Sequence, residues 1–337
     1  MNSLVTITLL LIVSLTVLFF TDDVSASSSV VYVNASSGDD NNDGSSWMLA
    51  KRSIKNATKT VTNGGTVRIA DGLYTGVSNT KITIDKDMII KGQSKSGTII
   101  NGTNNAWIFK IPKGKNVVIQ NLTLANGYRF VTERDENSDE IYDSDGGAII
   151  NKGTLTVEDS NFIGNTASDG GAIFNWGTLT VAGSTFAGNA ARLDGGAIVV
   201  LGTTTIIDSI FTNNAASYGG AISKSADLTL KKCTFINNIA YTAGGAIFNN
   251  ADYGVLIKID TVFVTSSDDI WNITEFINGE DITDPWTFVE PNGNDTSGPA
   301  VKAASRTVGM QSTGIPVAGF VVAVLMVLSG LTLPRKK

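Results

Sequence analysis

The feature that most constrains this chain is an internal repeat in its middle. The tetrapeptide Gly-Gly-Ala-Ile occurs five times at spacings of 24 or 25 residues, starting at Gly146, Gly170, Gly195, Gly219 and Gly244. A phenylalanine and, three residues later, an asparagine keep the same period: Phe162, Phe186, Phe211 and Phe235, then Asn165, Asn189, Asn214 and Asn238. Five copies in register predict stacked units, each of which contacts mainly its neighbours.

Within each repeat, short runs of alternating residues predict β-strands. Residues 155–157, 179–181, 204–206 and 228–230 alternate apolar side chains with threonine, except that Thr204 replaces the first apolar one. A period of two is typical of strands that bury one face. Leucine-rich repeats share the length of the unit, but their signature is absent. We therefore predict an all-β fold, a right-handed parallel β-helix with 24–25 residues per coil over residues 64–264.

In such a stack each repeated residue lies above its copy in the next coil, at the ~4.8 Å spacing of neighbouring strands. We expect the four phenylalanines to form an aromatic column and the four asparagines a hydrogen-bonded ladder. Because both sets repeat with the coil, we assign them to the scaffold rather than to ligand binding.

The segments beside the solenoid predict closures of its two open ends, which would otherwise expose strand edges. Residues 27–63 form an N-terminal segment with a capping helix from Ser45-Ser46 to about Val61. One face of this helix is apolar: Trp47, Ala50, Ile54, Ala57 and Val61. Residues 265–290 carry aromatic side chains and form the predicted C-terminal closing segment, and residues 291–311 form a polar stalk.

The two ends of the chain predict export and anchoring. Residues 4–20 are almost wholly apolar and precede Val24-Ser25-Ala26, so residues 1–26 are a predicted signal peptide. An uncleaved anchor is the alternative. Residues 315–333 are uncharged and precede Arg335-Lys336-Lys337. We predict a transmembrane anchor over residues 312–337 with a cytoplasmic basic tail and the body outside. A sorting signal that is later removed stays open.

Composition excludes several classes of site. The chain has 337 residues, no histidine and one cysteine. It therefore lacks the residues for a histidine-based nucleophile system, a histidine-ligated metal or an intramolecular disulfide. The net charge of −6 gives no electrostatic footprint for nucleic acid, so we expect no nucleic-acid partner.

Two acidic stretches have the oxygen spacing of a calcium loop, so calcium is the single candidate cofactor. In the first, Asp39, Asn41 and Asp43 precede a glycine, but Ala50 stands where a glutamate belongs. The second has Asp135, Asn137 and Asp139. It lies in a predicted binding loop with seven acidic residues: Glu133, Asp135, Glu136, Asp139, Glu140, Asp143 and Asp145. Ordinary turns and a solvated loop are the alternatives.

Six sequons predict N-glycosylation of an exported chain. Their asparagines are Asn34, Asn56, Asn101, Asn121, Asn272 and Asn294.

Three parts of the sequence resemble known families. The Gly-Gly-Ala-Ile…Phe-x-x-Asn coils resemble the chlamydial polymorphic outer-membrane-protein repeat. Residues 32–47 and 65–74 resemble the N-terminal cap of pectate-lyase-like right-handed β-helices, and residues 310–337 are similar to the anchor of methanogen adhesin-like proteins. Together they resemble an archaeal adhesin-like surface protein. This resemblance implies surface display and adhesion by the outside of the rod.

We therefore predict a surface-displayed binding protein for cell–cell or cell–glycan attachment, with an unidentified glycan or protein ligand. We assign no catalytic residues. The alternatives are an extracellular polysaccharide lyase or glycoside hydrolase on the same fold, and a passive envelope component. Glycosidases need two facing carboxylates, and the acids Glu158 and Asp159 meet no acid at 182 or 183 one coil later.

Overall fold

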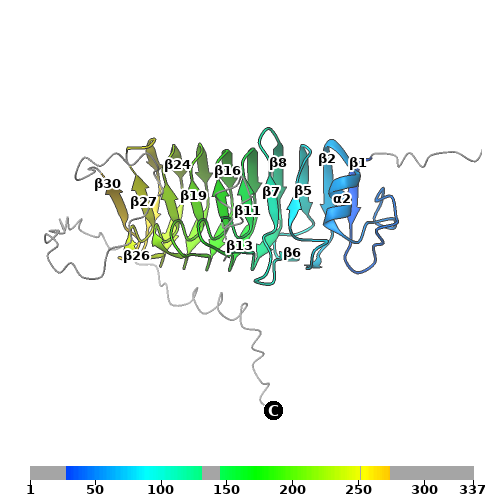
Figure 1. The fold of residues 1–337 in the computed structure, drawn as a ribbon, viewed down its shortest axis with the longest axis horizontal. Helices are drawn as coiled ribbons and strands as arrows, with labels where there is room; N and C mark the ends of the chain where they lie inside the picture. The colour runs from blue at the N-terminus through cyan, green and yellow to red at the C-terminus, as the bar shows by residue number, and fades with distance from the viewer. Residues whose placement is uncertain (1–27, 131–144, 251, 274–337) are drawn as a thin grey trace, which may run out of the picture. The chain divides into compact units, whose positions relative to one another are not determined.

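The structure is a computed structural model that describes residues 28–130, 145–250 and 252–273. These residues form an all-β parallel solenoid (Figure 1), in which the described strands pair in parallel with the coils before and after. The predicted signal peptide, most of the acidic loop, and the predicted stalk and anchor lie outside the described residues. Within the described part, no helix is long and apolar enough to cross a membrane.

Two of the four sheets hold the alternating runs and the phenylalanines. Sheet A has nine strands: β1 (Ser28–Val33), β2 (Val61–Ile69), β5 (Met88–Gly92), β8 (Asn116–Gln120), β12 (Thr154–Glu158), β16 (Thr178–Ala182), β20 (Thr204–Ile207), β24 (Leu228–Lys231) and β28 (Leu256–Ile259). Sheet B has eight: β3 (Gly72–Tyr74), β6 (Thr98–Asn101), β9 (Thr123–Ala125), β13 (Asn161–Ile163), β17 (Thr185–Ala187), β21 (Ile210–Thr212), β25 (Thr234–Ile236) and β29 (Val262–Phe263).

The other two sheets flank the Gly-Gly corners. Sheet C follows each corner: β4 (Ile82–Thr83), β7 (Phe109–Ile111), β11 (Ile149–Asn151), β15 (Ile173–Asn175), β19 (Ile198–Val200), β23 (Ile222–Lys224), β27 (Ile247–Asn250) and β30 (Ile270–Ile273). Sheet D precedes it in the later coils: β10 (Tyr128–Arg129), β14 (Thr166–Ala167), β18 (Ala190–Ala191), β22 (Ala215–Tyr218) and β26 (Ile239–Ala243). The right-handed sense of the coil stays a prediction.

The helix is shorter than the sequence indicates. It is α2 (Ile54–Thr60), and Ser53, not Ser45 or Ser46, accepts the capping hydrogen bond from the backbone of Asn56. The carboxylate of Asp40 fixes Ser53 by accepting from its hydroxyl and its backbone N–H. The helix packs on β1 and β2 at one end of the solenoid (Figure 1). Trp47 does not join its buried face: the ring is 44% exposed and meets Tyr32 edge-on.

The sheets also extend beyond residues 64–264. Strand β1 pairs with β2 at the start, because Val31 and Val33 alternate inward against Val67 and Ile69. At the other end β30 continues sheet C.

The four repeated phenylalanines lie in one column. Their ring centroids are 4.7, 4.8 and 4.9 Å apart, and neighbouring planes differ by 6°, 4° and 8°. All four are fully buried. The column continues to Phe263, whose ring centroid is 4.9 Å from that of Phe235.

The four repeated asparagines form a ladder. The Nδ2 of each of the first three donates to the Oδ1 of the next copy, at 2.9 Å from Asn165 to Asn189, 3.0 Å from Asn189 to Asn214 and 2.9 Å from Asn214 to Asn238. Each of the four Nδ2 groups also donates to a backbone carbonyl of the preceding coil, as Asn189 does to Phe162. These buried amides are thus satisfied by the scaffold itself.

Both glycines of the corner are required by the backbone. The first has a positive φ, as in Gly170 at 61° and Gly195 at 57°. At the second, an added Cβ would lie 2.2 Å from a carbonyl oxygen of the next coil in the case of Gly171. The first glycine therefore allows the left-handed turn, and the second allows neighbouring coils to approach.

Interrupting the phenylalanine column should lower the free energy of unfolding by a large amount. Phe186→Ala removes a buried ring from between two others, so we expect a loss of about 3–5 kcal/mol in the free energy of unfolding. Denaturant unfolding followed by circular dichroism measures it. Tyr241→Ala is the control, since Tyr241 is 79% exposed and surface changes cost within about ±0.5 kcal/mol. Equal effects of the two changes would contradict the buried column.

Candidate functional site

The outward side of sheet C is buried in the middle coils, from β11 to β23, unlike the outward side of sheet A. In β15, Ile173 points into the core while Phe174, which points outward, is also only 4% exposed. The covering side chains come from the position directly before each Gly-Gly corner. Ser223 of sheet C donates from its hydroxyl to the Asp194 carboxylate at 2.8 Å, and the ring of Phe248 lies 5.0 Å from that of Tyr218.

We call the position before each corner the corner column. Its members are Asp145, Asp169, Asp194, Tyr218 and Ala243. Bridges and strand pairs place successive members side by side, from Asp145 to Asp169, Asp194 to Tyr218, and Tyr218 to Ala243. Of these five residues, only Asp145 is a predicted site residue, as part of the acidic stretch. The signal for the others was available: they precede the same tetrapeptide.

The three aspartates form a carboxyl cluster in which Asp145 and Asp194 are buried and Asp169 is half-buried. The backbone N–H of Asp194 donates to Oδ1 of Asp169 at 3.0 Å. The side chains of Asp169 and Asp145 hydrogen-bond to each other, which requires a proton on one of the two carboxyls. Asp145 and Asp194 are each 4% exposed. A nearby cation is the exposed Arg192, which acts on the carboxyl of Asp169.

Burial determines the protonation of this cluster. It raises the pKa of Asp169 to about 6, although the backbone N–H of Asp194 and the guanidinium of Arg192 act in the opposite direction. Burial raises the pKa of Asp194 to about 7, and the carboxylate of Asp169 contributes to that increase. Perturbed carboxyls also occur in active sites, but Asp194 is too deeply buried to touch a polysaccharide chain.

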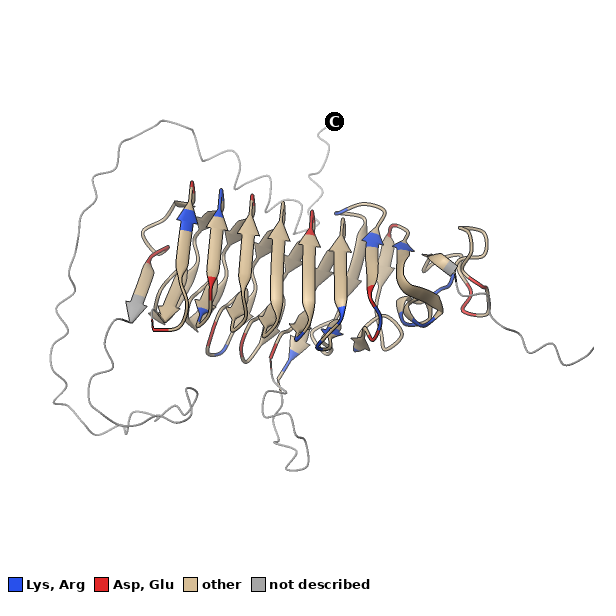
Figure 2. Cartoon of the chain, turned by 90° about the horizontal axis from the view of Figure 1, so that it is seen from above, with Lys and Arg blue, Asp and Glu red and all other residues tan. Residues whose placement is uncertain are grey.

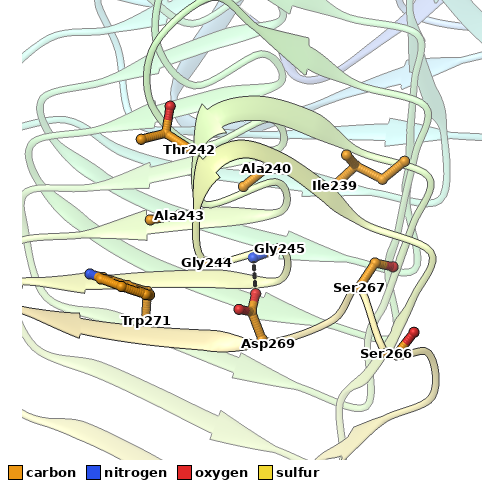
Figure 3. A pocket seen from close by; sticks show the side chains of 10 residues that line it. All are labelled: Ile239, Ala240, Thr242, Ala243, Gly244, Gly245, Ser266, Ser267, Asp269 and Trp271. Carbon is orange, nitrogen blue, oxygen red and sulfur yellow. Dashed lines mark hydrogen bonds between the residues drawn. The ribbon is translucent and has the colours of Figure 1, made fainter. Parts of the chain in front are cut away.

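A pocket opens where the corner column reaches Ala243. It has a volume of about 270 Å³ and lies beside the last described coil (Figure 3). Ten residues line it: Ile239, Ala240, Thr242, Ala243, Gly244, Gly245, Ser266, Ser267, Asp269 and Trp271. Asp269 accepts a hydrogen bond from the backbone N–H of Gly245 (Figure 3). None of these ten is a site residue predicted from the sequence, because their proximity depends on the stacking of two coils.

The first predicted calcium loop uses its oxygens internally. Asp39 Oδ1 accepts from the backbone and side-chain nitrogens of Asn41 at 2.9 and 3.0 Å. Asp43 Oδ1 accepts from the backbone of Ser45 at 2.8 Å, which lowers the pKa of Asp43. Among the described residues, including the three aspartates of the carboxyl cluster, no group of three acidic, cysteine or histidine side chains has an arrangement that could hold a metal ion. Calcium binding stays a prediction.

The second calcium loop and the rest of the acidic segment lie outside the described residues, apart from Asp145. Its members Glu133, Asp135, Glu136, Asn137, Asp139, Glu140 and Asp143 therefore stay predictions.

Several sequon amides take part in the fold. Asn56 Nδ2 donates to the Ser53 hydroxyl at 3.0 Å, and Asn121 Nδ2 donates to the carbonyl of Gln93 at 2.9 Å. Asn101 Oδ1 accepts from the backbone of Thr103 at 2.7 Å, and Asn34 Oδ1 accepts from that of Ser36 at 3.0 Å. The side chain of Asn272 and all of Asn294 lie outside the described part of the chain.

Comparison with known proteins relates the coils to one repeat family. Residues 159–175, 208–224 and 232–250 match the Chlamydia polymorphic membrane protein repeat. No curated protein gives a significant match.

Solved structures with a similar fold are pectin methylesterases. PemA from Erwinia chrysanthemi has a TM-score of 0.47 and 15% identity, over 72% of this chain and 80% of that one. The Yersinia enterocolitica enzyme has a TM-score of 0.41 and 14% identity, over 65% and 80%. The Aspergillus niger enzyme has a TM-score of 0.37 and 11% identity, over 77% and 93%. At such identities the likeness concerns the fold alone.

The carboxyl cluster predicts that the solenoid is more stable in weak acid than at neutral pH. The folded pKa values exceed the ordinary 3.8, so between about pH 4 and 7 the native state holds protons that the unfolded state releases. The free energy of unfolding therefore falls as the pH rises through this window. We expect Asp194→Asn to raise the Tm at pH 7.5 by roughly 3 °C or more, since 1 kcal/mol corresponds to about 2–4 °C in a domain of this size.

Thermal unfolding at pH 5.0, 6.0 and 7.5 measures this effect. The matched control is Asp208→Asn, because Asp208 is exposed. If Asp194→Asn and the parent protein show the same dependence of Tm on pH, the cluster does not hold the protons assigned to it.

Proposed function

We propose that this protein is an adhesin-like surface protein that attaches the cell to a glycan or protein ligand through the outside of its solenoid. The observation that carries the proposal is the match of three coil segments to the Chlamydia polymorphic membrane protein repeat. The family's name describes membrane proteins, which supports a cell-surface location for this chain. The resemblance to archaeal adhesin-like proteins belongs to the proposal as well.

Exposed aromatic side chains support a binding role over a passive one. Among the described residues, these include Trp47, Trp176, Tyr241, Tyr253 and Trp271. Tyrosine and tryptophan offer large contact areas at a low cost in conformational entropy. Charged residues of both signs are interspersed along the coils in the view of Figure 2, so a neutral ligand suits the described coils better than a highly charged one.

The carboxyl cluster is the observation that favours the second candidate, a polysaccharide lyase or glycoside hydrolase. It combines Asp145, Asp169 and Asp194 with the cation of Arg192. Two of its carboxyls are almost fully buried, and the pocket is lined by none of them. A hydrolytic role would need these side chains to reach a substrate, so attachment remains the better-supported function.

Export and anchoring complete the proposal. Residues 1–26 direct the chain out of the cytoplasm and are removed, and residues 312–337 hold it in the membrane with the basic tail on the cytoplasmic side. The solenoid is then exposed to the surroundings.

Surface display predicts a defined mature N-terminus and access to external reagents. We expect N-terminal sequencing to find Ser27 first. Protease added to intact cells should remove the solenoid, while a cytoplasmic marker protein stays intact. A mature chain that begins at Met1 would contradict removal of residues 1–26, and a solenoid that is protected until the cells are opened would contradict surface display.

Attachment and catalysis predict different results for the full chain. We expect cells that carry the full chain to bind surfaces coated with glycans or with other cells at least several-fold better than cells that lack it. The full chain should release neither reducing ends nor unsaturated uronides from pectin and other polysaccharides. Release that disappears in Asp169→Asn would establish the enzyme instead.

A further inference from the structure

The pocket beside Ala243 lies where the small side chain of Ala243 interrupts a series of contacts between the corner column and sheet C. In two earlier coils the corner residue contacts the outward side chain of sheet C in the following coil, as Asp194 contacts Ser223 and Tyr218 contacts Phe248. The next pair in this series is Ala243 with Trp271, which follows Phe248 in the register of sheet C. A methyl group cannot fill the space that a phenol ring fills one coil earlier, so about 270 Å³ stays open.

The two sides of this pocket differ in chemistry. Trp271 is 45% exposed and offers an aromatic surface. Asp269 is exposed and accepts one hydrogen bond from Gly245, and because a carboxylate has about four lone-pair sites, it can accept more. Figure 3 shows Trp271 and Ala243 on one side of Asp269. The hydroxyls of Ser266 and Ser267 lie on the other side (Figure 3).

We propose that this pocket binds one neutral sugar ring, which stacks on Trp271 and donates hydroxyl hydrogen bonds to Asp269. A sugar ring has apolar C–H groups on its faces and hydroxyls at its edge, so it needs an aromatic surface and acceptors at its rim. The volume lies just below the ~300–1,000 Å³ typical of pockets for drug-sized ligands, which suits a single ring.

The charge of the lining selects against acidic sugars. Among the ten described residues around the pocket, none is lysine or arginine, and Asp269 contributes a carboxylate. A uronate would therefore meet a like charge without a compensating cation, which disfavours its binding.

The experiment uses the purified full chain and five methyl glycosides as probes. These are the neutral methyl glycosides of glucose, mannose, galactose and N-acetylglucosamine, and the acidic one of galacturonic acid. Saturation-transfer NMR detects contact, and isothermal titration measures the Kd. We expect at least one neutral glycoside to bind with a Kd in the millimolar range, and methyl galacturonoside to bind at least 10-fold more weakly.

Three variants test the assignment of the site. Ala243→Tyr places at this position the residue that Tyr218 provides one coil earlier, so it should fill the pocket, keep the Tm and weaken binding at least 10-fold. Trp271→Ala should weaken binding to a similar degree. This variant removes a ring, so its effect does not depend on how an introduced tyrosine fits. Trp176→Ala is the matched control, since Trp176 is also exposed, at 37%, but lies outside the pocket; its affinity should equal that of the parent.

Several results would overturn the proposal. One is that no neutral glycoside binds the parent at about 50 mM, far above a millimolar Kd. Others are equal binding of methyl galacturonoside, or unchanged affinity in Trp271→Ala. The sugar site rests on the proposed attachment function, but different results refute the two proposals. If the solenoid is protected from external protease and still binds the glycoside, surface display is refuted and the sugar site is not.

Discussion

Parallel, in-register hydrogen bonding between successive coils is the constraint on which the rest of this structure depends. Every strand of sheet A pairs with the corresponding strand of the next coil, as Leu155 pairs with Leu179 and Val157 with Val181. A residue is therefore surrounded by its own copies, about one strand spacing away. Under this constraint a side chain is favourable when it packs well against copies of the same residue in the neighbouring coils, which explains the stacked phenylalanines and the asparagine ladder.

The ends of these columns show how the stack is terminated. The asparagine ladder ends at Asp268, whose carboxylate accepts from the backbone and side chain of Asn238 at 2.8 and 3.0 Å. A carboxylate accepts without donating onward, so it closes the ladder. In sheet A the inward column of Leu230 ends in Lys258, whose ammonium lies 5.7 Å from the ring centroid of Phe263. A charge at an inward position of the last described strand of sheet A opposes continued pairing with another edge.

The corner column shows how a repeated scaffold obtains individual chemistry. Its backbone position is constant, because each member precedes a left-handed glycine. Its side chains change from aspartate through Tyr218 to Ala243, and with them the local property changes from a protonated carboxyl cluster to a filled aromatic contact and then to an open pocket. The same backbone position therefore carries a buried carboxyl in one coil, an aromatic contact in another and an open pocket in a third.

The sequence by itself determined the solenoid, because a period of 24 or 25 residues with alternating runs is a local signal that repeats. It also determined the phenylalanine and asparagine columns, since a constant period places copies above one another. Only the tertiary structure decided that the outward side of sheet C is covered in the middle coils, that Asp194 is buried beside Asp169, and that Trp271 faces the space beside Ala243. The contacts of Asp194 with Ser223 and of Tyr218 with Phe248 join different coils at offsets other than the repeat. Such diagonal contacts depend on how each turn folds back over its neighbour. Asp169 and Asp194 lie one repeat apart, but a constant period does not determine whether their side chains are buried. The start of the helix also required the structure, because Asp40 organises Ser53 as the cap across a loop, a contact that helix periodicity does not encode.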